Sequence, residues 1–490
     1  MHIGLRNILT CNWKLLLSVI ILSYTNSMNG QQDLWVGINS KSPALAIQFN
    51  PAQYSWDENQ YFSANVFSFS TNYGNQFGYF KEMNIFRLLT HLDQINAPTL
   101  SSENGNIYDP DNPNIKYGPY DFHLLKSESK RDGFYSSAQV RGPGFIFRLK
   151  NDYAIGLITG IRAYTGMQGV DESINYYNYL MYIGGDKISI RPMSAKALSY
   201  LYAGLHISKN WTINSRTHFG IGSNIKYLGG IAAGYLTSKE TINSYRFIKT
   251  DQQTIDNGSF EFHYSHNDLE DWKTGKLVRG SGIGFDLGFS WSQTFTSPTW
   301  QKINFGAALV NWGVIKFGND LRKGSFKIND TTDIRYGLFR DDQNADELLA
   351  SAKEIVNSKT ANQFVSNRGG TVKEFPDLNL DLQIQLRDYA SLSIYNSIPL
   401  NRESPEVYYF AISPGFNYGK FALSVPLSYD RLAQYRLGMS IHYDFITIAT
   451  DDLRTLFNRQ RLQSASVFFA TNFKLYQSKA QLALMRRKKF

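Results

Sequence analysis

The sequence has very little cysteine and no long apolar run. Cys11 is the single cysteine in 490 residues, and no apolar run reaches the roughly 18 residues that a membrane-spanning helix needs. A polytopic helical transporter is therefore excluded. Charged residues make up 19% of the chain and apolar residues 42%, which excludes a disordered or collagen-like chain. The formal net charge of +9 is small for this length, so nucleic acid is not an expected partner.

The first thirty residues have the pattern of a secretory signal peptide. Arg6 and Lys14 precede an apolar stretch over residues 15–24, and small and polar residues follow it. A basic start, an apolar segment of about 7–15 residues and a polar cleavage region define such a signal. We predict a signal peptide over residues 1–30, cut after Gly30 or after Ser27. The alternative is a short buried or anchoring helix.

The position of Cys11 bears on the chemistry of the mature chain. It lies before the apolar stretch, whereas a lipid-modified cysteine would directly follow it. Cleavage would remove Cys11 and leave no cysteine. Disulfides, thiolate catalysis and cysteine-ligated zinc are therefore not expected.

Beyond about residue 60, apolar and polar residues alternate with a period of two. In residues 378–386, LNLDLQIQL, every even position is apolar, and in residues 283–291, IGFDLGFSW, every odd position is apolar. The same alternation recurs in residues 303–309 and 437–445. Successive side chains of a strand point to opposite faces, so each segment has one apolar and one polar face.

Charged residues respect this alternation and indicate a membrane barrel. An Arg or Lys at the midplane of the lipid-facing surface costs about 2–4 kcal/mol, a large part of a typical stability of roughly 5–15 kcal/mol. The polar face is then the lumen. The candidate lumen-facing residues are Arg148, Asp286, Asp381, His442 and Asp444. The alternative is a soluble β-sandwich or propeller with its apolar face turned inwards, but a propeller would show a repeat of 40–50 residues, and none is found.

Counting strands gives thirteen, one of them over residues 435–449. Short turns alternate with long polar connections over roughly residues 163–198, 228–279 and 313–377. Short periplasmic turns and long extracellular loops are typical of outer-membrane barrels, which have an even strand number. We therefore predict an all-β fold, an antiparallel transmembrane β-barrel of about fourteen strands over residues 59–476. The missing strand is placed near residues 76–86 or 228–236, or at residues 479–490. Otherwise residues 477–490 form a basic tail.

One segment has helical rather than strand spacing. Residues 342–357 place Leu348, Leu349, Ala352, Ile355 and Val356 at intervals of three and four, which predicts a short helix. It falls between the seventh and eighth strands, in a long extracellular loop. The helix either folds over the pore mouth or only fills the loop.

Three short motifs resemble a known family. Asn50-Pro51-Ala52 stands just before the first strand, residues 309–317 read LVNWGVIKF, and residues 450–453 read TDDL. Together they resemble a Bacteroidota family of outer-membrane barrels of unassigned function, related to FadL-type and PorV-type barrels. The FadL resemblance implies a barrel plugged by its N-terminal segment, here residues 31–58, that admits hydrophobic molecules. Asn50, Pro51 and Ala52 are then the candidate plug or gating residues. The PorV resemblance implies a barrel that holds or shuttles cargo in type IX secretion.

No constellation of residues indicates catalysis, a metal or a cofactor. His263 and His266, with Glu261 and Asp268, lie in a polar loop where they need not converge on a metal. Residues 109–120 resemble a calcium loop but end in Tyr120, where a Glu is required. We therefore expect a non-enzyme.

The predicted function is an outer-membrane barrel, most simply a plugged channel for small hydrophobic ligands. The alternative is a structural, assembly or secretion-associated barrel that docks envelope proteins through its loops. Both place the protein in outer-membrane lipid.

Overall fold

The computed structural model describes residues 34–39, 42–53, 60–76, 78–81, 122–124, 132–170, 187–247, 252–265, 277–297, 300–335, 345–387, 389–401, 408–430, 432, 434–457, 461–462 and 464–476. The predicted signal peptide and the basic residues 477–490 lie outside the described residues.

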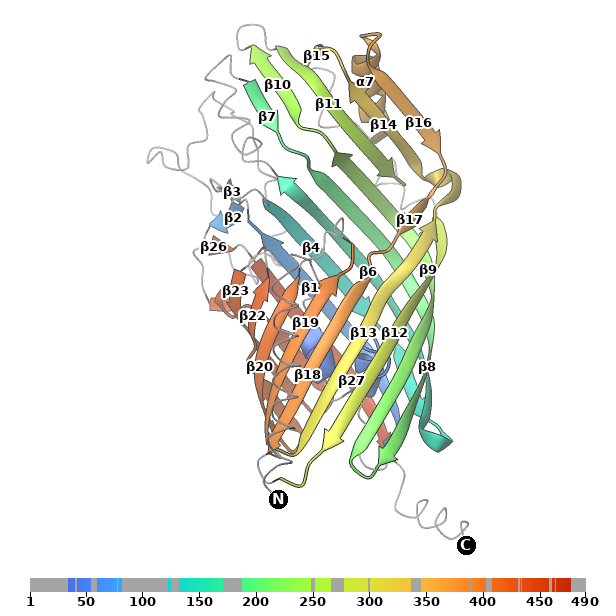
Figure 1. The fold of residues 1–490 in the computed structure, drawn as a ribbon, viewed down its shortest axis with the longest axis vertical. Helices are drawn as coiled ribbons and strands as arrows, with labels where there is room; N and C mark the ends of the chain where they lie inside the picture. Colours follow the sequence, from blue (N-terminus) through green and yellow to red (C-terminus); the bar gives the residue numbers. More distant parts are fainter. Residues whose placement is uncertain are drawn as a thin grey trace, which may run out of the picture.

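The fold is a closed, fourteen-stranded antiparallel β-barrel (Figure 1). The barrel closes where β1 pairs with β27 along most of its length, for example Phe69 opposite Phe469. In chain order, the wall consists of β1 (Gln60–Asn75), β4 (Asp132–Arg141) with β5 (Gly144–Arg148), β6 (Tyr153–Val170), β8 (Ser194–Asn214), β9 (Thr217–Ser238), β12 (Gly280–Thr294), β13 (Lys302–Lys316), β18 (Asp377–Arg387), β19 (Ala390–Pro399), β20 (Tyr409–Tyr418), β21 (Phe421–Ser424) with β22 (Leu427–Asp430), β23 (Gln434–Leu437) with β24 (Met439–Tyr443), β25 (Ile446–Thr450) and β27 (Ser464–Tyr476).

The fourteenth strand lies inside the range 435–449, which the alternation predicts as one strand. This range contains the end of β23, β24 and most of β25, with Tyr443 paired to Ile446 across a two-residue turn. Asp444 takes a left-handed backbone conformation there, with φ of 53°, which tight hairpin turns require and which Asp tolerates better than most residues.

Of the three places proposed for the missing strand, the first two are therefore wrong and the third is not tested. Residues 228–236 extend β9, and residues 78–81 form β2 (Gly78–Lys81). β2 belongs to a separate three-stranded sheet with β3 (Phe122–Leu124) and β26 (Arg461–Leu462). Residues 479–490 lie outside the described residues.

Much of the predicted long loops is strand. These strands continue the wall beyond the barrel on one side (Figure 1), and we call them the extension. They are β7 (Lys187–Ile190), β10 (Ile242–Phe247), β11 (Gln252–Tyr264), β14 (Arg322–Ile328), β15 (Thr332–Arg335), β16 (Gln363–Arg368) and β17 (Thr371–Lys373). The predicted helix is present as α7 (Ala345–Asn357), beside β14, β15 and β16.

The alternating side chains place apolar residues outside the barrel and polar residues inside. On β8, Leu205 is 68% exposed while its neighbour His206 is 2% exposed. The same contrast recurs along the wall. Exposed apolar residues include Ile207, Ile221, Ile225, Ile283, Leu287, Leu427, Ile441, Ile448 and Phe473. A soluble sandwich would bury these side chains, so that alternative is excluded. No helix in the described part of the chain is long and apolar enough to span a bilayer.

Aromatic side chains form a row near the short turns. The ring of Trp211 lies 5.6 Å from that of Phe219, which lies 4.8 Å from Phe289, and Phe289 lies 6.2 Å from Phe305. Outer-membrane barrels carry aromatic girdles of this kind at the membrane interfaces. The row therefore marks one edge of the lipid-facing band.

Candidate functional site: an N-terminal segment inside the barrel

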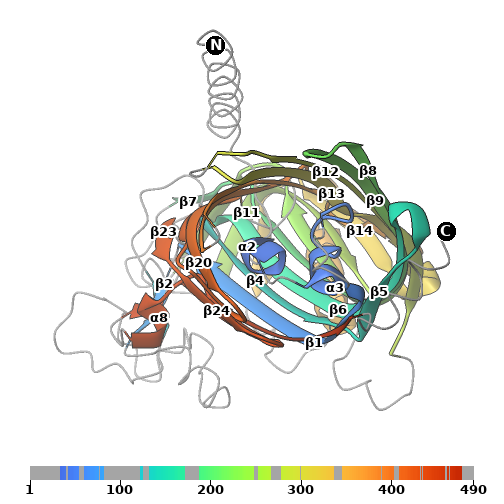
Figure 2. The same cartoon turned by 90° about the horizontal axis from the view of Figure 1, so that it is seen from below.

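The first described residues of the chain, from Leu34, lie inside the barrel. We call residues 34–53 the inner segment, of which 34–39 and 42–53 are described; it contains α2 (Leu34–Asn39) and α3 (Pro43–Ala46). Figure 2 shows both helices within the ring of strands. Pro43 begins α3, a position where its missing N–H costs nothing.

Three large apolar side chains anchor the inner segment. Trp35, Leu45 and Phe49 are at most 1% exposed, and they form one apolar cluster with wall residues that include Tyr395 and Tyr409. Burial of such a side chain contributes about 1.5–3 kcal/mol. The segment is therefore packed into the lumen rather than merely threaded through it.

Wall side chains also bind the backbone of the segment after α3. Asn224 Nδ2 donates to the Ile47 carbonyl at 2.9 Å, and Asn379 Nδ2 donates to the Phe49 carbonyl at 3.2 Å. Ser290 Oγ donates to the Ala52 carbonyl at 2.9 Å. Carbonyls at the end of a helix lack intrahelical partners and need others when they are buried. Three strands supply those partners.

The Asn50-Pro51-Ala52 motif forms a turn held against β12. Asn50 Oδ1 accepts a hydrogen bond from the Ala52 N–H at 3.0 Å, so the side chain closes its own turn, and Asn50 Nδ2 donates to the Phe289 carbonyl at 3.1 Å. Gln53 then donates to the carboxylate of Asp381. These contacts fix the C-terminal end of the inner segment.

Glycines in the wall make room for this turn, and the sequence prediction missed them. A Cβ atom at Gly222 would lie 2.2 Å from the Pro51 carbonyl oxygen, and one at Gly288 would lie 2.3 Å from Asn50 Oδ1. A Cβ atom at Gly306 would lie 2.3 Å from Gln53 Oε1. The sequence does hold a signal for them. Each of these three glycines occupies a lumen-facing position of its strand, where a polar side chain is otherwise expected.

Buried ion pairs surround the segment. Lys226 Nζ lies 2.7 Å from Asp286 Oδ1, with side chains 7% and 2% exposed. Asp286 also accepts from Asn224 Nδ2 at 2.9 Å and from the Asn311 N–H at 2.9 Å. Since Asn224 also binds the Ile47 carbonyl, the ion pair and the inner segment share one hydrogen-bond network. Removing one member of a buried pair leaves an uncompensated charge, which costs far more than the pair contributes.

The network continues towards the extension. Arg162 lies 4.0 Å from Asp377, which also accepts from Asn311 Nδ2 at 3.0 Å. The Tyr200 hydroxyl donates to Glu374. Beyond these groups, Lys196 Nζ lies 4.8 Å from the Tyr235 ring centre and 4.9 Å from that of Phe375.

The candidate lumen residues divide into two groups. Asp286, Asp381 and His442 are buried; the first two contact the network above, and His442 Nδ1 lies 2.8 Å from Thr447 Oγ1. Arg148 and Asp444 instead lie at exposed turns. Arg148 pairs with Asp152 at 3.1 Å, and Asp444 pairs with Lys420 at 2.7 Å. Arg148 is the last residue of β5 and Asp444 lies in the turn between β24 and β25. The lumen position of these two exposed residues stays a prediction.

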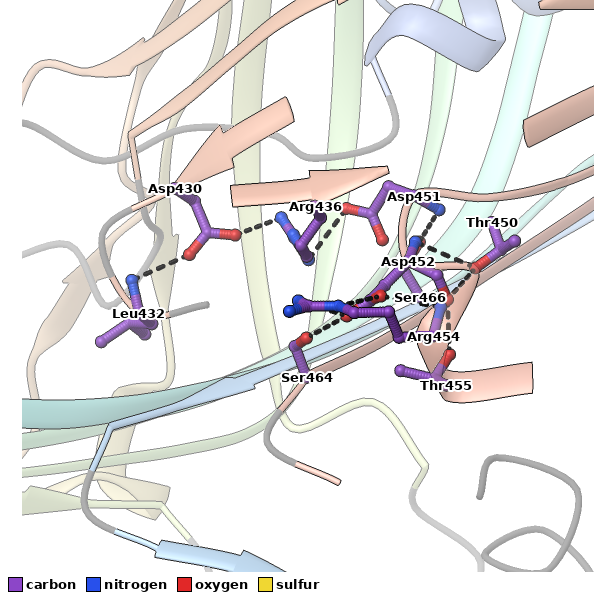
Figure 3. Close-up of polar contacts among 10 residues, drawn as sticks. All are labelled: Asp430, Leu432, Arg436, Thr450, Asp451, Asp452, Arg454, Thr455, Ser464 and Ser466. Atoms are coloured by element: carbon purple, nitrogen blue, oxygen red, sulfur yellow. Dashed lines mark hydrogen bonds and ion pairs between the residues drawn. The ribbon is translucent and has the colours of Figure 1, made fainter. Parts of the chain in front are cut away.

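A second polar cluster closes a seam in the wall (Figure 3). Arg436 of β23 pairs with Asp430 of β22, and the Nη1 atom of Arg436 lies 2.9 Å from Asp451 Oδ2. Asp452 accepts from Ser464 Oγ of β27 at 2.7 Å. We call these five residues the polar seam, and all five are at most 3% exposed.

The polar seam stands where strand pairing ends. β25 pairs with β27 only as far as Ala449 opposite Phe468, and the chain then leaves the wall through α8 (Arg454–Phe457). Among the described strands, β23 and the first residues of β27 have no pairing with each other. Side-chain contacts, with one backbone bond from Leu453 to the Leu437 carbonyl at 2.8 Å, connect the two sides there.

Among the described residues, no group of three or more His, Cys, Asp or Glu side chains could hold a metal. The loop histidine His266 and the residues 109–120 that resemble a calcium loop lie outside the described residues.

Comparisons with known proteins give one family and several solved structures of similar fold. A family model described as a family of unknown function (DUF5723) matches residues 52–451. No curated protein matches the sequence. The fold is similar to that of a TodX monoaromatic hydrocarbon channel lacking S2 and S3, with a TM-score of 0.39, 8% identity and coverage of 92% of this chain and 99% of that one.

Two further solved structures are similar over 92% of this chain and 99% of theirs. The Ralstonia pickettii toluene transporter TbuX has a TM-score of 0.36 and 12% identity. A Pseudomonas aeruginosa FadL homologue has a TM-score of 0.26 and 10% identity. At these scores the likeness carries no argument about function.

Proposed function

The chain belongs to a family of unknown function, DUF5723, and we propose that this member is an outer-membrane channel for small apolar molecules, closed by its inner segment. The observation that carries the proposal is the packing of residues 34–53 inside the barrel. A structural barrel has no need of a separate segment that is hydrogen-bonded to three strands yet not part of the wall.

The lumen chemistry favours apolar over charged solutes. Two of the buried charges near the segment, Lys226 and Asp286, are paired with each other, and Asp381 accepts a hydrogen bond from Gln53. The buried rings of Tyr200 and Tyr202, with centres 6.4 Å apart, form an apolar cluster with Ala44 and Ile47 of the segment, and Phe375 packs against it. Ligand sites typically combine apolar walls with a few fixed polar groups.

Deleting residues 33–56 tests this function. The change removes the inner segment and leaves β1 intact, so ionic conductance in planar bilayers should rise well above that of the full chain. Uptake of an uncharged alkyl or aryl probe into proteoliposomes should rise with it. Heat-modifiable mobility on denaturing gels should show that the shortened barrel still folds. Unchanged conductance of a folded variant would count decisively against the proposal.

The extension supports a second candidate, a barrel that docks envelope proteins. Its strands rise beyond the barrel on one side (Figure 1), and β16 is exposed at most positions. Affinity purification from solubilised membranes should then recover a stoichiometric partner, which a variant lacking residues 322–368 would lose. Recovery of a monodisperse barrel alone would exclude this candidate.

A further inference from the structure

An apolar groove lies between α7 and the strands of the extension. Its volume is about 430 Å³, within the range of small-molecule sites. Residues from β8, β9, β11 and β14 form its floor, and Leu349 and Ala352 of α7 form its side. A groove on the inner face of the wall would belong to the lumen, whereas one on the outer face would be separate from it.

Strand register places the groove outside the barrel. On β8, Lys196 and Leu198 are buried and point inwards, whereas Ala197 between them is exposed. Ala197 pairs with Gly234, and Ala195 pairs with Leu236, so these four residues share the outer face.

The neighbouring strands confirm this assignment of faces. Tyr235 contacts Lys196 on the inner face, and the His263 ring lies 5.2 Å from the Tyr235 ring. Phe262, the neighbour of His263 that pairs with Leu236, therefore points outwards. The groove thus opens on the opposite side of the wall from the lumen.

The described lining of the groove is aromatic and aliphatic. Two lining rings are held by neighbours outside the lining: Phe326 stacks on Phe260 with ring centres 4.6 Å apart, and Phe262 on Phe364 with ring centres 6.3 Å apart. The two basic residues of the lining, Lys196 and His263, carry their side chains on the inner face. Burial, followed by the charge of Lys323, lowers the pKa of His263. The described lining on the outer face thus offers flat ring faces and no ionised side chain. Such a lining suits an uncharged apolar ring.

The groove stands just above the lipid-facing band. A strand tilted by about 40° climbs roughly 2.5 Å per residue, so an apolar band of about 25 Å spans about ten residues. Counted along β8 from Trp211, the band ends near Leu201. Ala197 then lies about 10 Å above it, on the same outer face. The groove is therefore continuous with the membrane surface and not with the lumen.

We propose that this groove is an external binding site for uncharged, ring-sized apolar molecules, which it holds at the outer surface directly above the bilayer. A molecule released downwards along the outer face of β8 meets Leu201 and then the lipid. The site depends on the register of the extension and is independent of the channel proposed for the lumen.

Photolabelling tests the site with the full chain in lipid nanodiscs. The probe is 3-phenyl-3-(trifluoromethyl)diazirine, an uncharged benzene derivative, with toluene as competitor. Labelled peptides should contain Leu236, Leu349 or Ala352, and toluene should reduce that labelling. Gly234 can be enlarged, because the nearest atom to an added Cβ is Ala197 Cβ at 3.9 Å. In Gly234→Phe, labelling of these peptides should fall by at least about fivefold, which corresponds to about 1 kcal/mol of lost binding.

Matched variants separate the possible outcomes. Ala203→Phe adds the same ring to the outer face of β8 within the lipid-facing band and should leave groove labelling unchanged. Ala352→Trp fills the groove from α7 and serves if Gly234→Phe fails to fold. Deletion of residues 33–56 should change conductance but not groove labelling. Labelling confined to lipid-facing or lumen positions, or groove labelling that persists in both filled variants, would overturn the proposal.

Discussion

Replacing Gly222 by leucine should open the barrel without dismantling it. The new Cβ would lie 2.2 Å from the Pro51 carbonyl oxygen and 2.5 Å from its carbon, and the backbone of the inner segment has to move away. The wall itself tolerates the change, because Gly222 occupies an ordinary strand position opposite Ser208 and Gly288. The substitution therefore acts on the segment rather than on strand pairing.

The size of this effect follows from the contacts that the segment loses. The hydrogen bonds to the Ile47, Phe49 and Ala52 carbonyls contribute about 1 kcal/mol each. Losing all three moves the equilibrium between seated and unseated segment by about 3 kcal/mol, or about two orders of magnitude. Single-channel recordings in planar bilayers should show this as long open periods that are rare in the unmodified protein.

Gly234→Leu is the matched control for this prediction. It places the same side chain on the same strand, on the outer face, where an added Cβ has no atom nearer than 3.9 Å. Its conductance should equal that of the unmodified chain. If Gly222→Leu also conducts no more than the unmodified chain, the segment is not held by this turn, and the role assigned to Asn50, Pro51 and Ala52 fails.

The sequence predicts the barrel well wherever one face of a strand meets lipid. In such strands a charge on the wrong face costs several kcal/mol, so the alternation is strict, as it is from Ile283 to Trp291. The strands of the extension have no lipid on either face. Arg322 and Lys323 stand side by side in β14, and no alternation marks such a strand, which is why these strands read as loops.

The same reasoning explains the miscounted strand. Residues 437–445 alternate up to Phe445, and the tight turn at Asp444 leads directly into Ile446 and Ile448 of the next strand. A two-residue turn restores the apolar face almost at once, so periodicity alone gives no sign of a reversal. Only the backbone preference of Asp for left-handed conformations hints at it.

The inner site could be located but not assembled from the sequence. The Asn50-Pro51-Ala52 motif is visible, whereas the hydrogen-bond partners of the inner segment on β9, β12 and β18 lie between 177 and 330 residues away. Strand register across the barrel decides which glycine of the wall faces a given atom of the inner segment. Register in turn depends on the turns, the least predictable elements here.

Replacing Arg436 by methionine should produce the largest loss of stability. Asp430 and Asp451 would remain buried at 0% exposure without the guanidinium that now contacts both. Breaking a buried pair in this way costs about 3–5 kcal/mol. Urea titration in lipid vesicles, followed by tryptophan fluorescence, should show an earlier unfolding midpoint. Hydrogen exchange should accelerate in residues 434–437 and 464–467, on the two sides of the polar seam.

Two comparisons decide whether the polar seam has this role. Lys420→Met removes the exposed partner of Asp444, a pair of 2.7 Å with side chains 68% and 42% exposed, and exposed pairs contribute little. Its unfolding midpoint should match that of the unmodified barrel. Adding Asp430→Asn and Asp451→Asn to Arg436→Met removes the uncompensated charges and should recover part of the loss, because replacing a whole buried ionic group is far less costly than breaking it. Equal midpoints for Arg436→Met and Lys420→Met would mean that water reaches the seam and that backbone pairing alone holds the wall closed there.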